Sequence, residues 1–372
     1  MDWDQLELNP RVITAVKRAN LKSAREVLSL SGADLQRLTK LSQSDVQQLH
    51  SAVAASYCRE PPVTALQLLR GECPSLEPSH RLSLGCPVLD SLLRGGVPLT
   101  GITEIAGESG AGKTQLCMQL CLSVQYPREH GGLGSGAVYI CTESAFPSKR
   151  LQQLISLQAR LRPELPPNLV TSIQFSNNIY IEHAADLEAL QVCVSRRVPI
   201  MLLRGMVRLV VVDSVAALFR CEFEAKEARE RARHLLAFAQ SLHRLSQSFS
   251  TPVICVNQVT DVVGDSDSAR CNFGLVDRRV LPALGITWAN QVLVRLMMSP
   301  LSGWDAVRAE GSSLVSRRLE VVFAPHLPQA YCICSVGKEG VRGIAVPTQS
   351  ASAPHIPGTE PANCTTDVNK DT

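Results

Sequence analysis

The sequence lacks the features that mark several common classes of protein. Its net charge is only +3 over 372 residues, which is too small to indicate a nucleic-acid partner, so any contact with DNA must come from local patches. No apolar run approaches the roughly 18 residues of a membrane span. The most apolar stretch, 199–219, is interrupted by Arg204, Arg208 and Asp213. We therefore expect a globular protein without a membrane segment.

Targeting signals and paired metal-binding cysteines are also missing. The N-terminus carries Asp2, Asp4 and Glu7 instead of a basic and then apolar start, which argues against a secretory or transit peptide. The thirteen cysteines include no Cys-x-x-Cys pair. Cys117 and Cys121 have a helical spacing that could hold a metal, but no histidine or second cysteine pair is near, so we favour buried apolar thiols. Free thiols indicate a reducing compartment.

Hydrophobic residues make up 45 % of the chain and charged residues 19 %, which predicts a sizeable core. Residues 1–58 form a separate, all-α unit, because four capping signals precede short amphipathic segments. These signals are Asn9 before Pro10, Ser23, Ser31, and Ser42 with Asp45. Basic residues of this unit could grip a DNA backbone, although a solvated face is the preferred interpretation. They are Lys17, Arg18, Lys22 and Arg25.

Residues 59–80 are rich in proline and predict a linker, in which the apolar run 63–66 either docks a partner or lies against the chain's own core. Residues 81–342 alternate strand and helix patterns, which predicts an α/β fold with a mostly parallel sheet flanked by helices. Expected strands are 101–106, 137–141, 173–181, 208–214 and 252–258. Expected helices are 87–93, 114–124, 151–161 and 224–248. Further strands are expected in 286–296, 318–323 and 330–336, and a disordered tail in 343–372.

One glycine-rich stretch has the pattern of a phosphate-binding loop. It reads GESGAGKT, lies between a predicted strand and a predicted helix, and matches Gly-x₄-Gly-Lys-Thr. Glycines let such a loop curl so that its N–H groups surround phosphates at a helix N-terminus. The predicted nucleotide-binding residues are Gly107, Glu108, Ser109, Gly110, Ala111, Gly112, Lys113, Thr114 and Gln115. Lys113 would reach the β- and γ-phosphates of ATP, and Thr114 would ligate Mg²⁺.

Polar residues at the ends of three other predicted strands should converge on the same crevice. Asp213 is the candidate acid for Mg²⁺, with a helix cap as the alternative. Glu143 is the candidate general base, with a surface acid as the alternative. Gln258 could sense the γ-phosphate, although a plain polar residue at a strand end is almost equally plausible.

These segments together resemble one family. GESGAGKTQLCMQLCLSVQYP, AVYICTESAFPSKRL, LVVVDSVAALFR and VICVNQV are similar to the nucleotide-binding, catalytic-glutamate, Mg-binding and sensor segments of the RecA-type recombinases, specifically the eukaryotic strand-exchange recombinases and their paralogues. The resemblance covers about residues 1–340 and includes the order of the helical unit, linker and RecA-like core.

The resemblance implies a function in homologous recombination repair of DNA double-strand breaks and crosslinks. It implies a slow, DNA-dependent ATPase that uses ATP and Mg²⁺, acts in the nucleus and also in the cytoplasm and mitochondria, and forms a heterodimer with another recombinase paralogue. Further implied partners are the main strand-exchange recombinase and single-stranded and branched DNA.

Two DNA-facing loops are also implied by the resemblance. The first lies near 220–233, where the alternative is simply the charged start of a helix, and the second lies in 260–285. With only Phe223 and Phe273 for stacking, backbone contacts are the expected mode. The basic residues of the loops are Arg229, Arg231 and Arg233, and Arg270, Arg278 and Arg279.

One departure bears on assembly. The recombinases have a Phe-x-x-Ala motif in the linker, where this sequence reads Pro62-Val63-Thr64-Ala65. Loss of a buried phenylalanine forfeits roughly 1.5–3 kcal/mol, so long self-filaments are not expected and a dedicated partner is. Two alternatives remain: a RecA-like hexameric DNA motor or helicase, against which the small helical unit argues, and a non-catalytic module whose assembly ATP stabilises.

Overall fold

The computed structural model describes residues 3, 6, 8–57, 63–70, 80–223, 225–261, 280–301 and 316–345. The chain divides into two compact units, 1–78 and 79–372, and the division falls inside the predicted linker. Each unit is considered by itself. No helix among the described residues is long and apolar enough to cross a membrane.

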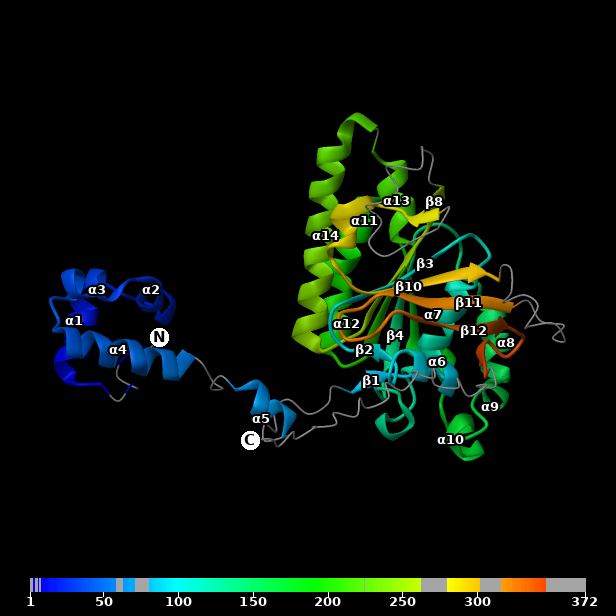
Figure 1. Ribbon diagram of the computed structural model, residues 1–372, viewed down its shortest axis with the longest axis horizontal. Coiled ribbons are helices and arrows are strands. Elements are labelled where there is room, and N and C mark those ends of the chain that lie inside the picture. The colour runs from blue at the N-terminus through cyan, green and yellow to red at the C-terminus, as the bar shows by residue number, and fades with distance from the viewer. Residues whose placement is uncertain are drawn as a thin grey trace, which may run out of the picture. The chain divides into compact units, whose positions relative to one another are not determined.

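The first unit is helical, as predicted (Figure 1). Its helices are α1 (Pro10–Arg18), α2 (Ala24–Ser29), α3 (Gly32–Thr39) and α4 (Gln43–Tyr57). All four predicted capping signals are confirmed: the side chains of Asn9, Ser23, Ser31 and Ser42 each accept a backbone N–H of the first turn. The helices enclose a core that includes Val12, Val16, Val27, Leu35 and Leu49.

Replacing Ser23 with alanine should lower the free energy of unfolding of this unit by about 1 kcal/mol. The Ser23 hydroxyl accepts the Glu26 N–H at 3.2 Å, and alanine leaves that donor to water. Hydrogen exchange of the α2 amides in the full chain is the measurement, and faster exchange in α2 without a change in the second unit is expected. Replacing exposed Ser29, which caps no helix N-terminus, is the control. Equal exchange in the two variants would contradict the capping role.

A helix that the sequence analysis missed follows in the linker. α5 (Ala65–Leu69) begins after Thr64, whose hydroxyl accepts the Gln67 N–H at 3.2 Å while Gln67 Oε1 accepts the Thr64 N–H at 2.8 Å. This reciprocal pair is a capping box. Val63 and Leu66 are exposed. Pro62 lies outside the described residues.

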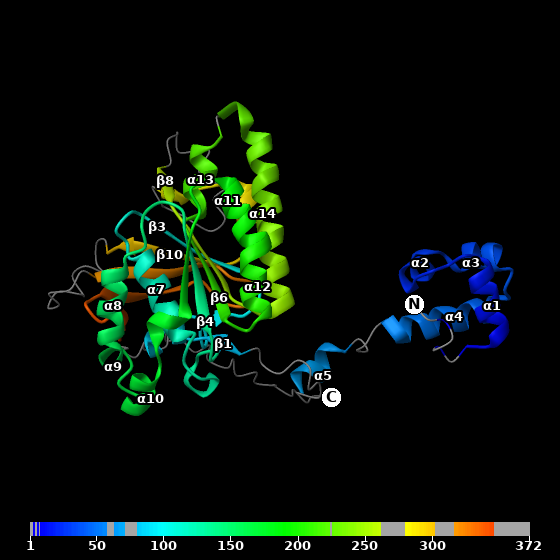
Figure 2. The ribbon, with the colours of Figure 1, turned by 180° about the vertical axis from the view of Figure 1, so that it is seen from behind.

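In the second unit, nine strands of the described residues form one mixed, mostly parallel sheet (Figures 1 and 2). Their order is β13-β12-β11-β10-β3-β7-β6-β4-β5. All pairings from β10 to β5 are parallel, and those from β10 to β13 are antiparallel. The strands are β3 (Ile102–Gly107), β4 (Gly136–Cys141), β5 (Ile179–His183), β6 (Val207–Asp213), β7 (Val253–Asn257), β10 (Val292–Pro300), β11 (Ser316–Phe323), β12 (Ala330–Val336) and β13 (Val341–Ile344). Short pairs are β1 (Arg81–Leu82) with β2 (Val97–Pro98) and β8 (Val259–Asp261) with β9 (Val280–Pro282).

Helices cover both faces of the sheet, so the continuous apolar strands are buried on each side. One face packs against α6 (Pro87–Leu92), α7 (Lys113–Ser123) and α8 (Ser148–Ser156), with α9 (Gln158–Leu161) and α10 (Pro167–Ser172) following in the chain. The other packs against α11 (Leu187–Val192), α12 (Val198–Leu203), α13 (Val215–Cys221), α14 (Ala228–Phe249) and α15 (Gly285–Ala289). The predicted fold class is confirmed.

Three element predictions were wrong in part. Residues 173–178 are not strand: a 3₁₀ turn occupies Phe175–Asn178, and strand begins only at Ile179. The Asn178 amide donates to the Gln174 carbonyl at 3.5 Å, a local side-chain bond that competes with strand pairing. Residues 286–289 belong to α15, and the helix predicted for 151–161 breaks at Leu157 into α8 and α9.

The described chain continues two residues further into ordered structure than predicted, because β13 ends at Ile344. The remainder of the predicted tail, from 346 on, lies outside the described residues. α14 begins at Ala228, somewhat after the predicted start, and its predicted inward residues are buried. They are Leu235, Phe238, Ala239, Leu242 and Leu245.

A buried glutamine joins the last strand to the helix behind the glycine-rich loop. Gln119 of α7 donates to the carbonyls of Leu84 and Val341 at 2.5 and 3.0 Å and accepts the Val341 N–H at 2.8 Å. The Gly343 N–H in turn donates to Cys86 Sγ at the start of α6, at 3.3 Å. β13 is thereby fixed to α6 and α7.

A buried carboxylate organises the centre of the sheet. Glu104 of β3 is fully buried and accepts Asn257 Nδ2 at 2.6 Å, Trp288 Nε1 at 2.7 Å, and Arg295 Nε. Three donors and an opposite charge offset the cost of removing the carboxylate from water. Asn257 also donates to the Ala283 carbonyl at 2.9 Å, so the network fixes the segment that follows β9 beside the end of β7.

Candidate nucleotide-binding site

The glycine-rich loop joins β3 to α7, as predicted. Gly112 adopts a left-handed conformation with φ +108° and immediately precedes the first turn of α7. At Gly107 a Cβ would lie 2.2 Å from the Met298 carbonyl oxygen, so no larger residue fits. Lys113 Nζ donates to the carbonyls of Gly107 and Glu108, both at 2.7 Å, which folds the lysine over the loop. Burial lowers the pKa of Lys113, and the nearby carboxylates of Asp213 and Glu143 oppose this shift.

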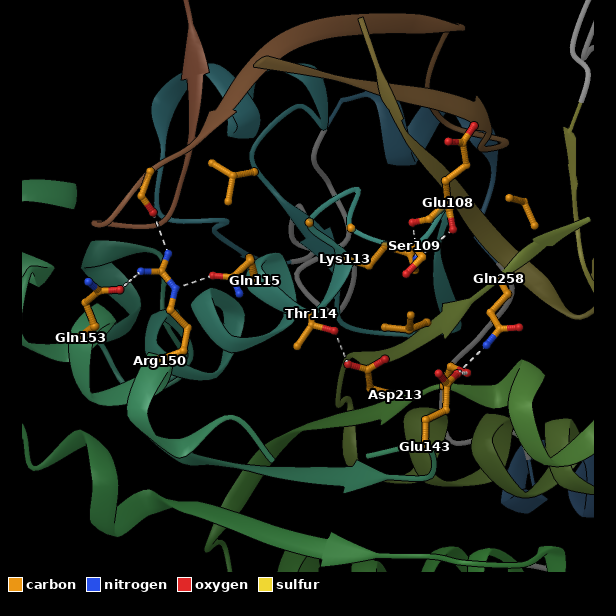
Figure 3. Close-up of a pocket in the computed structure, with 18 of the residues that line it drawn as sticks. Glu108, Ser109, Lys113, Thr114, Gln115, Glu143, Arg150, Gln153, Asp213 and Gln258 are labelled. Atoms are coloured by element: carbon orange, nitrogen blue, oxygen red, sulfur yellow. Dashed lines mark hydrogen bonds between the residues drawn. The ribbon is translucent and has the colours of Figure 1, made fainter. Parts of the chain in front are cut away.

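A cavity of about 910 Å³ opens in front of the loop (Figure 3). Every predicted loop residue except Ala111 lines it. The Ala111 side chain instead packs into the core beneath the loop, so its part in a phosphate site would be through the backbone. The cavity brings the loop together with Asp213, Glu143 and Gln258 from three other strand ends.

Asp213, at the end of β6, faces the first turn of α7. Its Oδ2 accepts the Thr114 hydroxyl at 2.7 Å and the Tyr139 hydroxyl at 2.5 Å (the former is drawn in Figure 3). The alternative role of Asp213 as a helix cap is not borne out, because Ser214 caps α13 by accepting the Ala217 N–H. Burial raises the pKa of Tyr139 well above its usual value, so its phenol stays a donor. The sequence analysis did not identify this tyrosine.

Glu143 follows β4 and faces Gln258, which follows β7. Gln258 Nε2 donates to Glu143 Oε1 at 2.8 Å, and the Ser214 hydroxyl donates to the same oxygen (Figure 3). Gln258 Oε1 accepts a hydrogen bond from Arg220 NH1 at 3.0 Å. Ser214 caps the start of α13 and Arg220 lies in its last turn, so both ends of one helix contact the Glu143–Gln258 pair.

Arg150 of α8 is a further cavity residue that the sequence analysis did not single out. Its guanidinium donates to Gln115 Oε1 at 2.6 Å, to Gln153 Oε1, and to the carbonyls of Gly337 and Lys338 at 2.6 and 2.8 Å. It therefore connects α7 to the turn between β12 and β13 on the far side of the cavity from Glu143 (Figure 3). A planar cation at this position is suited to contact an aromatic base.

The two predicted DNA-facing segments are only partly described. Arg229, Arg231 and Arg233 lie in the first turns of α14, which agrees with the alternative of a charged helix start and leaves DNA contact a prediction. Phe223 packs against the core and the His234 ring. Within 260–285, β8, β9 and the start of α15 form structure where none was expected. Arg270, Phe273, Arg278 and Arg279 lie outside the described residues.

Cys117 and Cys121 are buried in α7, and burial raises the pKa of both thiols. Among the described residues, no group of three or more His, Cys, Asp or Glu side chains is placed to hold a metal ion. The burial of both side chains agrees with the interpretation of these cysteines as apolar core residues.

The loop, the acid opposite its threonine and the sheet that carries both define a P-loop nucleotide-binding protein with a RecA-type core. Comparison with known proteins gives the narrower assignment. The Rad51 family model matches residues 79–344, and a model described as the XRCC3/RpoA-like helix-hairpin-helix domain matches residues 3–57. The chain belongs to the Rad51 family.

Individual relatives agree with this assignment. The chain is 55 % identical to DNA repair protein XRCC3 of Mus musculus over 344 residues, covering 92 % of this chain and 98 % of that protein. It is 56 % identical to the protein of the same name from Bos taurus, with the same coverage of both chains. With DNA repair protein RAD51 homolog 2 of Homo sapiens the identity is 31 % over 90 % of this chain and 86 % of that protein. The predicted resemblance to RecA-type recombinases and their paralogues is confirmed, and the family implies a nucleotide.

Proposed function

We propose that the chain is an ATP-binding DNA repair protein of homologous recombination, which acts on double-strand breaks and crosslinks by assisting recombinase assembly on DNA. The observation that carries the proposal is the pairing of Thr114 with Asp213 at the mouth of a glycine-rich loop that holds Lys113. This is the arrangement that a nucleoside triphosphate and a divalent cation require. The names of the most similar relatives support repair as the process.

Each residue of this site has a separate proposed role. The loop N–H groups and Lys113 would bind the phosphates, and Thr114 with Asp213 would hold Mg²⁺, which neutralises charge on the phosphates when bound. Glu143 would take a proton from the attacking water as general base. Gln258, held between Glu143 and Arg220, would report on the γ-phosphate. Arg150 and the turn at Gly337 would contact the base.

DNA and protein partners follow from the same proposal. The basic residues of α14 would contact DNA phosphates, and nuclear localisation follows from that substrate. A second recombinase paralogue would form a heterodimer with this chain, and the main strand-exchange recombinase would be the protein whose assembly it assists. The linker supports a dedicated partner, because Val63 and Leu66 are exposed and the sequence has Pro62 where the recombinases have a phenylalanine.

Replacing Ala65 and Leu66 with glutamate should disrupt the 1:1 complex with the partner paralogue while the core stays folded. Both side chains are exposed, so the charges disturb no core, but a bound partner would have to bury them. Co-purification followed by light scattering of the full chains is the measurement. Glutamates at Ser51 and Ala55, exposed on α4, are the matched control. A complex that survives at wild-type yield would remove α5 from the interface.

Measuring ATP turnover of the purified complex with and without DNA tests the proposed function. DNA-stimulated, slow turnover without strand unwinding is the expected result. Unwinding would favour the hexameric motor, and ATP binding with no turnover under any condition would favour the non-catalytic assembly module.

A further inference from the structure

Asp213 is held by two donors on a single oxygen. The Thr114 hydroxyl of α7 and the Tyr139 hydroxyl of β4 both donate to Oδ2, at 2.7 and 2.5 Å. A carboxylate fixed in this way cannot rotate without losing both hydrogen bonds. Hydrogen bonds to a charged acceptor are roughly twice as strong as neutral ones. The orientation of Asp213 is therefore set from two directions before any ligand binds.

We propose that Tyr139 is a positioning residue for the divalent cation, acting through Asp213. The inference rests on the proposed binding of ATP with Mg²⁺ and names a residue that supports the cation site without touching the nucleotide. Groups behind a metal's direct partners orient them and tune the affinity for the metal.

Packing holds the Tyr139 side chain in one position. It lies on a fully buried strand, the residue is 1 % exposed, and its ring packs edge-to-face against Phe146 with ring centroids 5.0 Å apart. Tyr139 is the register partner of Val211, and Cys141, two residues further along the same strand, is the register partner of Asp213. The Tyr139 and Asp213 side chains therefore lie on adjacent parallel strands, two residues apart in register. The Thr114 hydroxyl comes from the half-buried first turn of α7, whereas the packed ring of Tyr139 fixes the direction from which its hydroxyl reaches Asp213.

Phe146 gives the same tyrosine a second contact with the site. Phe146 lies three residues after Glu143, in the segment that leads into α8 and Arg150. The Tyr139 ring thus supports the segment of the candidate general base, while its hydroxyl orients the candidate magnesium acid. Replacement by phenylalanine separates the two roles, because the ring stays and only the hydroxyl is lost.

The test compares Tyr139→Phe with Tyr126→Phe in the full chain. Tyr126 is a matched control: it is also fully buried, its ring packs edge-to-face against Phe175, and its hydroxyl donates to Gln158 Oε1 at 3.1 Å, away from the cavity. A fluorescent ATP analogue is titrated in EDTA and in Mg²⁺, and Mg²⁺ is then titrated at fixed nucleotide. Thermal unfolding of each variant is recorded alongside.

Tyr139→Phe should raise the Mg²⁺ concentration for half-saturation about tenfold, equivalent to 1.4 kcal/mol, and leave the affinity in EDTA within about twofold of wild type. Tyr126→Phe should change neither value. In an Asp213→Asn background, Tyr139→Phe should have no further effect on the Mg²⁺ dependence, because the two residues act as one unit. If Tyr139 had only a structural role, the double variant would bind Mg²⁺ more weakly than Asp213→Asn alone.

Two outcomes overturn the inference in different ways. If the wild-type chain binds nucleotide equally with and without Mg²⁺, the proposed cation site fails and this role fails with it. If the wild type depends on Mg²⁺ and Tyr139→Phe has the same dependence, or Tyr126→Phe shifts it equally, only the role of Tyr139 is lost.

Discussion

Replacing Lys113 with alanine should lower the affinity for ATP about ten- to a hundredfold, because a charge-assisted contact of roughly 1.5–3 kcal/mol is removed. The lysine is the cation of the loop, and its present bonds to the carbonyls of Gly107 and Glu108 are to neutral acceptors that a phosphate can replace. Binding of a fluorescent ATP analogue to the full chain is the measurement, and repair activity should fall in parallel.

Replacing Lys149 with alanine is the control for this loss. Lys149 is exposed on α8, next in sequence to Arg150, and does not line the cavity. The Lys149→Ala substitution therefore removes one positive charge from the same region without removing a phosphate contact. If Lys113→Ala binds nucleotide as tightly as Lys149→Ala, the assignment of the phosphate loop is wrong.

Replacing Glu143 with glutamine should reduce ATP hydrolysis on the order of 10²–10⁴-fold while nucleotide binding is retained. A glutamine Oε1 can still accept the bonds that Gln258 and Ser214 now donate, so the local geometry survives and only the basic group is lost. Single-turnover hydrolysis in the purified complex, measured beside nucleotide affinity, distinguishes the two effects. The ATP-bound assembly on DNA should live longer.

Glu188→Gln, an exposed substitution on α11 outside the cavity, should hydrolyse ATP at the wild-type rate. Hydrolysis by Glu143→Gln at the original rate would mean that Glu143 is only an acid at a strand end, or that the partner supplies the general base.

The loop and the three strand-end residues could be predicted because their signals are local. A phosphate loop is a contiguous pattern, and Asp213, Glu143 and Gln258 each follow an apolar strand whose end is visible in the sequence. Parallel strands carry such residues to one edge of the sheet without further information. The helix caps of the first unit were equally local, since each depends on one side chain and the next backbone turn.

Residues whose roles depend on distant partners could not be predicted in the same way. Tyr139 sits in the run AVYIC and has the pattern of a core aromatic, and its acceptor Asp213 lies 74 positions away. Val341, which accepts from Gln119, and Gly337, which accepts from Arg150, are even more distant from those residues in the sequence. The prediction missed α5 for a different reason. The capping box of Thr64 and Gln67 is a local signal, but it lies in a segment rich in prolines.

Backbone groups at the β13 edge of the main sheet are already bonded to side chains. At the β13 edge, both backbone groups of Val341 are bonded to Gln119, and the Gly343 N–H is bonded to Cys86. An edge whose amides are already bonded offers no template for another strand. Growth of the sheet by a partner's strand is therefore restricted to the β5 edge. An assembly built in that way has a direction, with each chain accepting a neighbour on one side only.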